Sequence, residues 1–180
     1  MRRCVTLLSA IALFGGTAIM AQTGSANRMT NGTVSAADRT FMDKAAQGGL
    51  AEVQLGNLAK DHAKSQAVKD FGQKMVDDHT KANDELKSLA SQKNVTLPTD
   101  LDAKDKATYD RLSKLNGAAF DKAYMRDMVS DHRKDVAEFK KEASSGHDPD
   151  VKNWANTTVK TLEGHLSLAE STDKQVMSEK

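Results

Sequence analysis

Apolar and small residues recur every three or four positions along four long stretches of this chain, which is the spacing of one face of an α-helix. Each stretch is roughly 28 residues long and would form about 42 Å of helix. They cover approximately residues 36–63, 65–92, 117–145 and 149–176. A shorter amphipathic stretch, residues 103–115, lies between the second and the third. The pattern therefore predicts four long helices and one short one.

Capping residues indicate where these helices begin. Ser35 followed by Asp38 offers the first helix a hydroxyl cap and an acid near its positive end. Ser65 is the expected cap of the second helix, and Pro98 breaks the chain after that helix. Asp148-Pro149 combines an acidic cap with a proline at the first helical position, so it should start the last helix.

The lengths of the connections predict the topology. Very short loops join the first long helix to the second and the third to the fourth, so each pair should form an antiparallel hairpin. The fold class expected is all-α: a ferritin-like four-helix bundle over residues 35–176, built of two hairpins joined by a long crossover that carries the short helix. Residues 177–180 are expected to form a C-terminal tail. Only 4% aromatic residues and two prolines in 180 residues argue against a β-sandwich or barrel.

The charge balance limits the partners. The chain has 26 Lys and Arg against 25 Asp and Glu, for a formal net charge of +1. It lacks both the basic surplus and the stacking aromatic residues of nucleic-acid-binding proteins, so we expect no nucleic-acid partner.

The first residues have the layout of a secretory signal peptide. Arg2-Arg3 precede an apolar run over residues 4–20, and small residues follow it. We assign residues 1–21 to the signal, with cleavage as late as residue 26, and residues 22–34 to a flexible leader. The competing reading is an uncleaved anchor, but the run is shorter than the ~20 residues of a spanning helix. Cleavage would leave no transmembrane span and no cysteine, because Cys4 is the only one.

One ligand-type residue interrupts the small or apolar stripe of each long helix near its middle. In chain order these residues are Glu52, His79, His132 and His165. A carboxylate buried alone costs several kcal/mol or takes up a proton. Two arrangements would satisfy the four side chains: joint ligation of one metal ion, or a metal-free Glu–His network that fixes helix register.

Neighbouring residues supply candidate supporting groups. The sequence Met-Val-x-Asp-His occurs twice, at residues 75–79 and 128–132, in a chain with five histidines. Asp78 and Asp131 lie about 100° around the helix from their histidines, so we expect them in a second shell or in solvent. The residues best placed to orient the histidines are Asn83 and Asp135. Met75 and Met128 are expected to fill the core, although their thioethers would also suit copper.

Four segments resemble one large family. They are residues 45–53, with Gly48-Gly49-x-x-Glu52, residues 71–83 and 124–132, each with an Asp-His pair, and residues 162–165. They are similar to a bacterial domain-of-unknown-function family of exported, ferritin-like proteins that are often labelled predicted outer membrane proteins. The resemblance spans about residues 38–171. It implies a four-helix fold and a location in the periplasm or cell envelope, but no activity.

The spacing departs from that of di-iron proteins in one respect. Ferritin-type centres use a Glu-x-x-His pair on each of two helices, whereas Val76 and Leu162 occupy the positions three before His79 and His165. A di-iron centre is therefore disfavoured, and one zinc, copper or ferrous iron ion is the cofactor that suits three histidines and one glutamate.

Two functions from different classes fit these observations. One is an exported metal-binding bundle used in metal handling or envelope stress protection. The other is a non-metal structural or interaction module of the cell envelope. An enzyme is less favoured, because no nucleophile–base pair or Gly-rich phosphate loop is visible in the sequence. The sequence leaves the oligomeric state and any protein partner open.

We predict that the chain is exported and trimmed, because charge, apolar run and small residues occur in signal order. Full-length protein expressed in a bacterium should be recovered from the envelope fraction with a new N-terminus before about residue 30. Intact mass and N-terminal sequencing measure this. Envelope-extracted protein that retains Met1 would contradict it.

Overall fold

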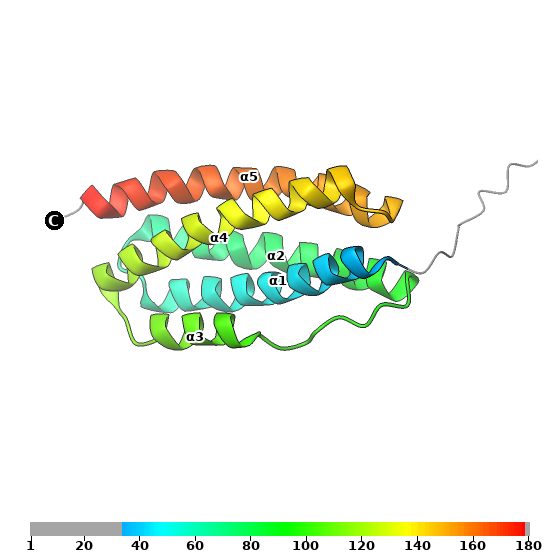
Figure 1. Cartoon of the computed structure of the whole chain (residues 1–180). Coiled ribbons are helices and arrows are strands. Elements are labelled where there is room, and N and C mark those ends of the chain that lie inside the picture. The colour runs from blue at the N-terminus through cyan, green and yellow to red at the C-terminus, as the bar shows by residue number, and fades with distance from the viewer. Residues whose placement is uncertain (1–33, 179–180) are drawn as a thin grey trace, which may run out of the picture. The chain divides into compact units, whose positions relative to one another are not determined.

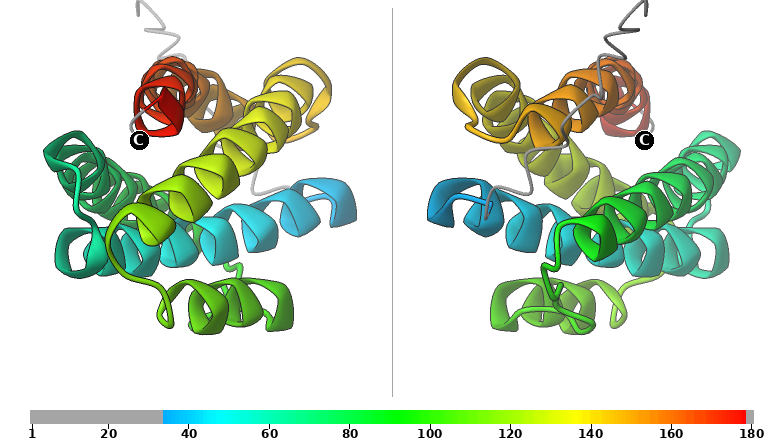
Figure 2. Two further views of the ribbon diagram at one scale, coloured as in Figure 1. Left: turned by 90° about the vertical axis from the view of Figure 1, so that its left-hand side faces the viewer. Right: turned by 90° about the vertical axis from the view of Figure 1, so that its right-hand side faces the viewer.

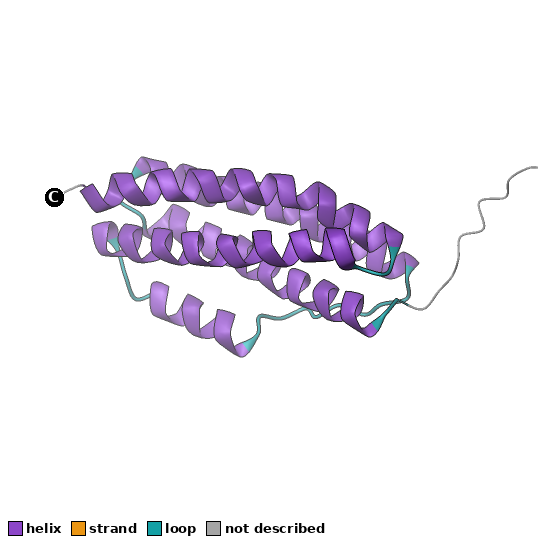
Figure 3. Ribbon diagram, turned by 45° about the horizontal axis from the view of Figure 1, so that its top comes forward, coloured by secondary structure: helices purple, strands orange, loops and turns teal. Residues whose placement is uncertain are grey.

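The computed structural model describes residues 34–178, and these residues form helices with no strand among them (Figures 1 and 3). The assigned signal peptide and almost all of the leader lie outside the described residues. The helices are α1 (Ala36–His62), α2 (Gln66–Gln92), α3 (Ala103–Leu112), α4 (Gly117–Ser145) and α5 (Pro149–Ser178). No helix within this range combines the length and the apolar character needed to cross a membrane.

The four long helices form the expected bundle of two antiparallel hairpins. α1 packs against α2 and α4 against α5, while α2–α5 and α1–α4 contacts join the two hairpins. α2 and α4 run in the same direction, so the crossover between them returns along the bundle and carries α3 (Figure 1). α3 lies outside the four long helices, against α1 and α4 (Figure 2). The fold class predicted from the sequence is confirmed.

The short helix ends three residues earlier than the sequence analysis placed it. α3 stops at Leu112, and residues 113–116 form a turn into α4. The carbonyl oxygen of Leu115 accepts a hydrogen bond of 2.7 Å from Nδ1 of His62. A tertiary hydrogen bond thus holds the segment that local periodicity would have continued as helix.

Buried aspartates bind the two hairpin loops. Asp38 on α1 accepts hydrogen bonds from the amides of His147 and Asp148 at 3.0 and 2.7 Å. Asp121 on α4 accepts from the amides of Lys64 and Ser65 at 3.0 and 2.9 Å. Each hairpin therefore supplies the carboxylate that satisfies the loop of the other.

Of the two serine caps predicted from the sequence, the structure contains one. Ser35 does cap α1, since its Oγ accepts from the amide of Asp38 at 3.1 Å. Ser65 stands at the N-cap of α2, but its side chain makes no capping hydrogen bond. The expected hydroxyl cap of α2 is wrong; the polar contact at this end is made by Asp121 from the other hairpin, which binds the amides of Lys64 and Ser65 just before the helix.

The interior consists of two apolar clusters with a polar layer between them. One cluster contains Phe71, Phe120 and Tyr124, and the other contains Phe41 and Phe139. On each long helix the boundary between the clusters falls at a ligand-type residue. These boundary residues are Glu52 on α1, His79 on α2, His132 on α4 and His165 on α5.

Glycine allows α1 and α2 to approach closely beside this layer. A Cβ built on Gly56 would lie 2.6 Å from the backbone oxygen of Gly72, and one built on Gly72 would lie 2.8 Å from Cβ of Ala59. No real Cβ fits at such distances, so the helix separation here depends on both glycines.

We predict that Gly72→Ala destabilises the bundle by about 1–3 kcal/mol, the usual effect of overpacking an interior contact. Gly164→Ala is the matched control, because Gly164 lies within α5 and nothing lies within 4 Å of its added Cβ. This control should gain about 0.5–1 kcal/mol from the higher helix propensity of alanine. Urea denaturation measures both free energies of unfolding, and a similar change in the two variants would contradict the close approach.

Candidate metal centre

The polar layer places one side chain from each long helix in the interior. His79 on α2 is 7% exposed, His132 on α4 is 0%, His165 on α5 is 1% and Glu52 on α1 is 1%. Each was singled out by the sequence as an interruption of an apolar stripe. Because the helices are long and pack side by side, positions near their middles meet at one level.

The three imidazoles form a compact triangle. Their ring centroids lie 5.8 Å apart for His79–His132, 5.3 Å for His79–His165 and 5.4 Å for His132–His165. One ring nitrogen from each lies within 4.8 Å of the others. Histidine nitrogens bind zinc at about 2.0–2.1 Å, so rotations that move each nitrogen by under about 1 Å would bring all three into contact with one ion.

Hydrogen bonds fix the orientation of two of the rings. Nδ1 of His132 donates to the carbonyl oxygen of Met128 at 3.0 Å, and Nε2 of His165 donates to Oδ2 of Asp78 at 2.7 Å. Both partners are acceptors, so in the neutral rings the opposite nitrogens carry lone pairs. Those two atoms, together with Nε2 of His79, are buried without a hydrogen-bond partner.

Burial keeps the three rings neutral. It lowers the pKa of His79 well below the ordinary histidine value, with further lowering by His132 and His165. Burial also lowers the pKa of His132, and it lowers that of His165 to about 4 despite the nearby Asp78. At neutral pH the layer therefore presents lone pairs rather than imidazolium charges.

Glu52 does not join the histidine triangle as a fourth member. Its Oε1 lies 3.8 Å from Nδ1 of His132, the nitrogen already bonded to a carbonyl, rather than in the group of three ring nitrogens. Instead, one oxygen of Glu52 lies within 4.8 Å of oxygens of Asp131 and Asp135. Of the four residues expected to surround one point, the three histidines thus form one group, whereas Glu52 forms a neighbouring carboxylate group with Asp131 and Asp135.

The surroundings of the acidic side chains shift their pKa values in different directions. Burial raises the pKa of Glu52 well above its ordinary value, with a further rise from Asp131. Burial, then Asp131 and Glu52, raises the pKa of Asp135 to about 7. Burial by itself would raise the pKa of Asp78, but the hydrogen bonds that it accepts from Lys74 and His165 outweigh burial, and the pKa is lowered.

The expected supporting residues take different places. Asp135 belongs to the carboxylate group. Asn83 lies against α1, where its Oδ1 would be 1.9 Å from a Cβ on Gly49. Met75 and Met128 are packed in an apolar cluster, and Met128 contacts the site through its carbonyl oxygen, which accepts the hydrogen bond from His132.

Asp78 and Asp131, expected to support the histidines or to lie in solvent, both contact residues of the polar layer. Each immediately precedes a buried histidine, and each reaches across to the other hairpin: Asp78 to His165, and Asp131 toward Glu52. A residue next to a core position on a helix flanks the contact with the adjacent helix. The repeated Asp-His pair in the sequence marked these two aspartates. Which residues they contact, however, depends on which helices are adjacent in the bundle.

Two cavities lead to the layer. One, of about 300 Å³, is lined by His79, Asp131 and Asp135 among others. The other, of about 120 Å³, is lined by Asp78, His79 and His165 among others. Within residues 34–178 no carboxylate or fourth histidine joins the three-histidine group, and the smaller cavity lies directly beside His79 and His165.

A family described as "Domain of unknown function (DUF4142)" matches residues 23–172. The chain belongs to the DUF4142 family. Among solved structures, this DUF4142 chain is similar to the crystal structure of a DUF305 fragment from Deinococcus radiodurans. The TM-score is 0.71 at 13% identity, and the match covers 80% of this chain and 99% of that one, which supports the fold alone. No curated protein matches the chain.

We predict that acid destabilises the metal-free DUF4142 domain through His165. Its pKa is about 4 when folded against 6.5 ordinarily, so between these values the unfolded state binds more protons. The stability contributed by the neutral ring is complete above pH 6.5 and is lost as pH falls toward 4, by up to about 3 kcal/mol.

Comparison of wild type with His165→Gln isolates this effect, because glutamine does not titrate. The comparison is needed since the raised pKa of Asp135 acts in the opposite direction between pH 4 and 7. Urea denaturation at several pH values gives both free energies of unfolding. Parallel pH curves for the two proteins would contradict the prediction.

Proposed function

We propose that this protein binds one transition-metal ion through His79, His132 and His165, and that it handles this ion in the cell envelope after export. The observation that carries the proposal is a buried group of three histidines: each offers a ring nitrogen within 4.8 Å of the others, and each has one buried ring nitrogen without a hydrogen-bond partner. Lone pairs gathered in an apolar interior are stabilised by a cation, and each unpaired buried acceptor otherwise costs about 1–3 kcal/mol.

The second nitrogens of two rings support the same reading. Histidines that bind metals usually donate their other N–H to a carbonyl or carboxylate, which fixes the tautomer and makes the ligand more basic. His132 donates to the Met128 carbonyl and His165 to Asp78. The site is thus prepared with its ligating nitrogens deprotonated before an ion arrives.

Three imidazoles and an accessible position suit zinc, copper or ferrous iron. An open position favours exchange of the ion or binding of an exogenous ligand, whereas a fourth protein ligand would close the site as in structural zinc centres. The 120 Å³ cavity beside His79 and His165 gives such a ligand a route to the rings. This arrangement fits metal handling better than permanent structural use.

The second candidate is a metal-free module in which the polar layer only fixes register. Glu52 near His132 is the contact that favours it. Such a layer specifies a fold when its members satisfy one another by hydrogen bonds. Here both oxygens of Glu52 and one nitrogen of each histidine lack partners, which favours the metal-binding proposal.

Support for the envelope location comes from the start of the chain. Arg2-Arg3, the apolar run and the small residues after it have the order of a signal peptide. The resemblance to exported bacterial proteins points the same way. Because Cys4 is the only cysteine, the mature chain has no thiolate to offer a transition metal, and its ligands of this class are histidine nitrogens and methionine thioethers.

We predict that one equivalent of zinc, copper or ferrous iron stabilises the tag-free mature protein. At a hundredfold excess over the dissociation constant the gain is about 2.7 kcal/mol. His79→Ala and His132→Ala should each abolish the metal-dependent rise in melting temperature. His147→Ala should retain it, because that ring is exposed at the hairpin loop.

Thermal unfolding with and without each ion gives the comparison within each variant, so a lower starting stability does not obscure it. Metal content after dialysis gives the stoichiometry. If none of the three ions changes the melting temperature of the wild type, the metal site is wrong and the register network is the better account.

A further inference from the structure

We propose a second cation site in this protein, formed by Glu52, Asp131 and Asp135, which takes a hard divalent cation such as Mn²⁺ or Ca²⁺. It is separate from the three-histidine group and uses none of its nitrogens, so it stands whether or not a transition metal binds there. Its three carboxylates come from α1 and α4, which face each other across the two hairpins.

The carboxylates are close enough to share one ion. One oxygen from each of the three lies within 4.8 Å of the others. Hard cations bind oxygen ligands at about 2.0–2.6 Å, which places ligand oxygens a few ångströms apart around the ion. Asp131 and Asp135 are four residues apart and therefore lie on the same face of α4.

Glu52 provides an independent indication of a ligand. It is 1% exposed, and neither of its carboxylate oxygens has a hydrogen-bond partner. Surface acidic clusters are common and are satisfied by water, but a carboxylate buried without any partner is rare and costly. Because its oxygen is directed at those of Asp131 and Asp135, a bound cation would satisfy it.

The cavity beside the trio supplies the remaining coordination. About 300 Å³ of space is lined by Asp131 and Asp135, together with residues of α1, α2 and α3. Mn²⁺ and Ca²⁺ need six or more ligands, and three carboxylates leave several positions for water. The cavity is large enough for these waters and connects the site to solvent.

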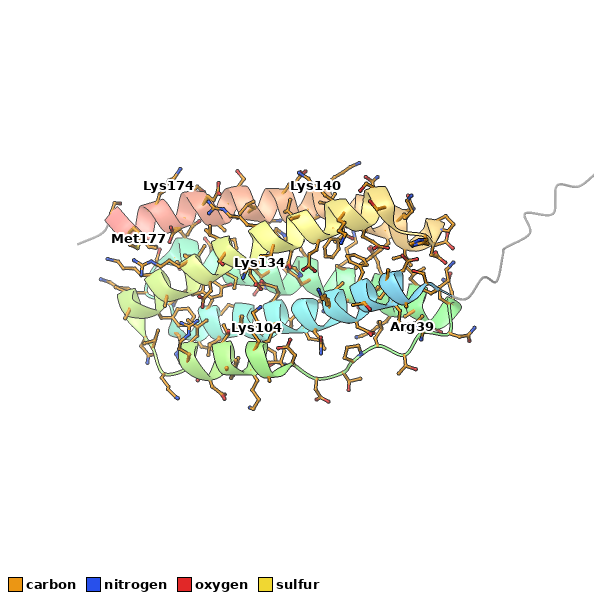
Figure 4. The ribbon with its side chains drawn as sticks, viewed as in Figure 1. Arg39, Lys104, Lys134, Lys140, Lys174 and Met177 are labelled. Carbon is orange, nitrogen blue, oxygen red and sulfur yellow. The ribbon has the colours of Figure 1, made fainter. Side chains whose placement is uncertain are left out.

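Two lysines contact the solvent side of the site. Lys104 on α3 and Lys134 on α4, both labelled in Figure 4, have Nζ at 3.4 and 3.8 Å from Oδ1 of Asp131. Both lysine side chains are mostly exposed, and such pairs contribute only about 0–1 kcal/mol. They can turn away when a divalent ion takes their place, and until then they compete with it.

Titration of the full mature protein with Mn²⁺, followed by electron paramagnetic resonance, tests the site. We expect one Mn²⁺ per chain that Ca²⁺ displaces. Glu52→Gln and Asp135→Asn should each weaken Mn²⁺ binding at least about tenfold, since each removes one charged ligand. Glu138→Gln is the matched control: it removes an exposed carboxylate from the wall of the same cavity and should weaken Mn²⁺ binding much less than either ligand variant, since Glu138 acts on Asp135 only through its charge.

Two further variants sharpen the assignment. Lys104→Gln should tighten Mn²⁺ binding, because it removes a positive charge that contacts Asp131. His79→Ala should leave Mn²⁺ binding in place while removing any zinc-dependent stabilisation, so failure of one site is distinguished from failure of the other. Far-UV circular dichroism checks that each variant is folded, and Asp135→Asn replaces Glu52→Gln if the buried amide prevents folding.

The proposal is overturned by any of three results. One is no Mn²⁺ binding by the wild type at millimolar concentration. Another is equal weakening by Glu138→Gln and Asp135→Asn, which would indicate only a diffuse negative field in the cavity. The third is loss of Mn²⁺ in His79→Ala, which would place the ion at the histidines instead.

Discussion

Burial of three neutral imidazoles and one carboxylate between two apolar clusters is the constraint on which the rest of this bundle depends. An unpaired polar atom in such an interior costs about 1–3 kcal/mol, and several of them together are comparable with the net stability of a small domain. The fold keeps His132 and His165 in place by giving each ring one acceptor, and it leaves the opposite nitrogens free. These unpaired atoms are the basis of the proposal that the layer binds metal ions.

The repeated Asp-His pair is the device that builds both groups. In each hairpin the histidine of the pair enters the interior, and the aspartate before it reaches the adjacent helix of the other hairpin. Asp78 thereby orients His165, whereas Asp131 completes the carboxylate group with Glu52. One short motif used twice therefore gives a nitrogen-rich group and an oxygen-rich group side by side, with different preferences for metal ions.

The bundle holds these groups in register from its ends and from one flank. Asp38 and Asp121 each bind the loop amides of the opposite hairpin, so the two hairpins cannot slide without breaking buried charge-assisted hydrogen bonds. The close approach at Gly56 and Gly72 fixes α1 against α2 near the layer. These contacts hold α2, α4 and α5 in the positions that keep one ring nitrogen of each of the three histidines within 4.8 Å of the others.

The sequence by itself determined the helices, their order and which residue of each interrupts the apolar face, because helical period and caps such as Ser35 and Asp148 are local. It also placed all four interior residues at one level. Only the tertiary structure decided their partners. Asp121 binds the amide of Ser65 from 56 residues away, and Glu52 groups with Asp131 and Asp135 rather than with the histidines. The reason is geometric: a stripe gives the face that a helix buries, but the rotation and pairing of the helices set which atoms meet.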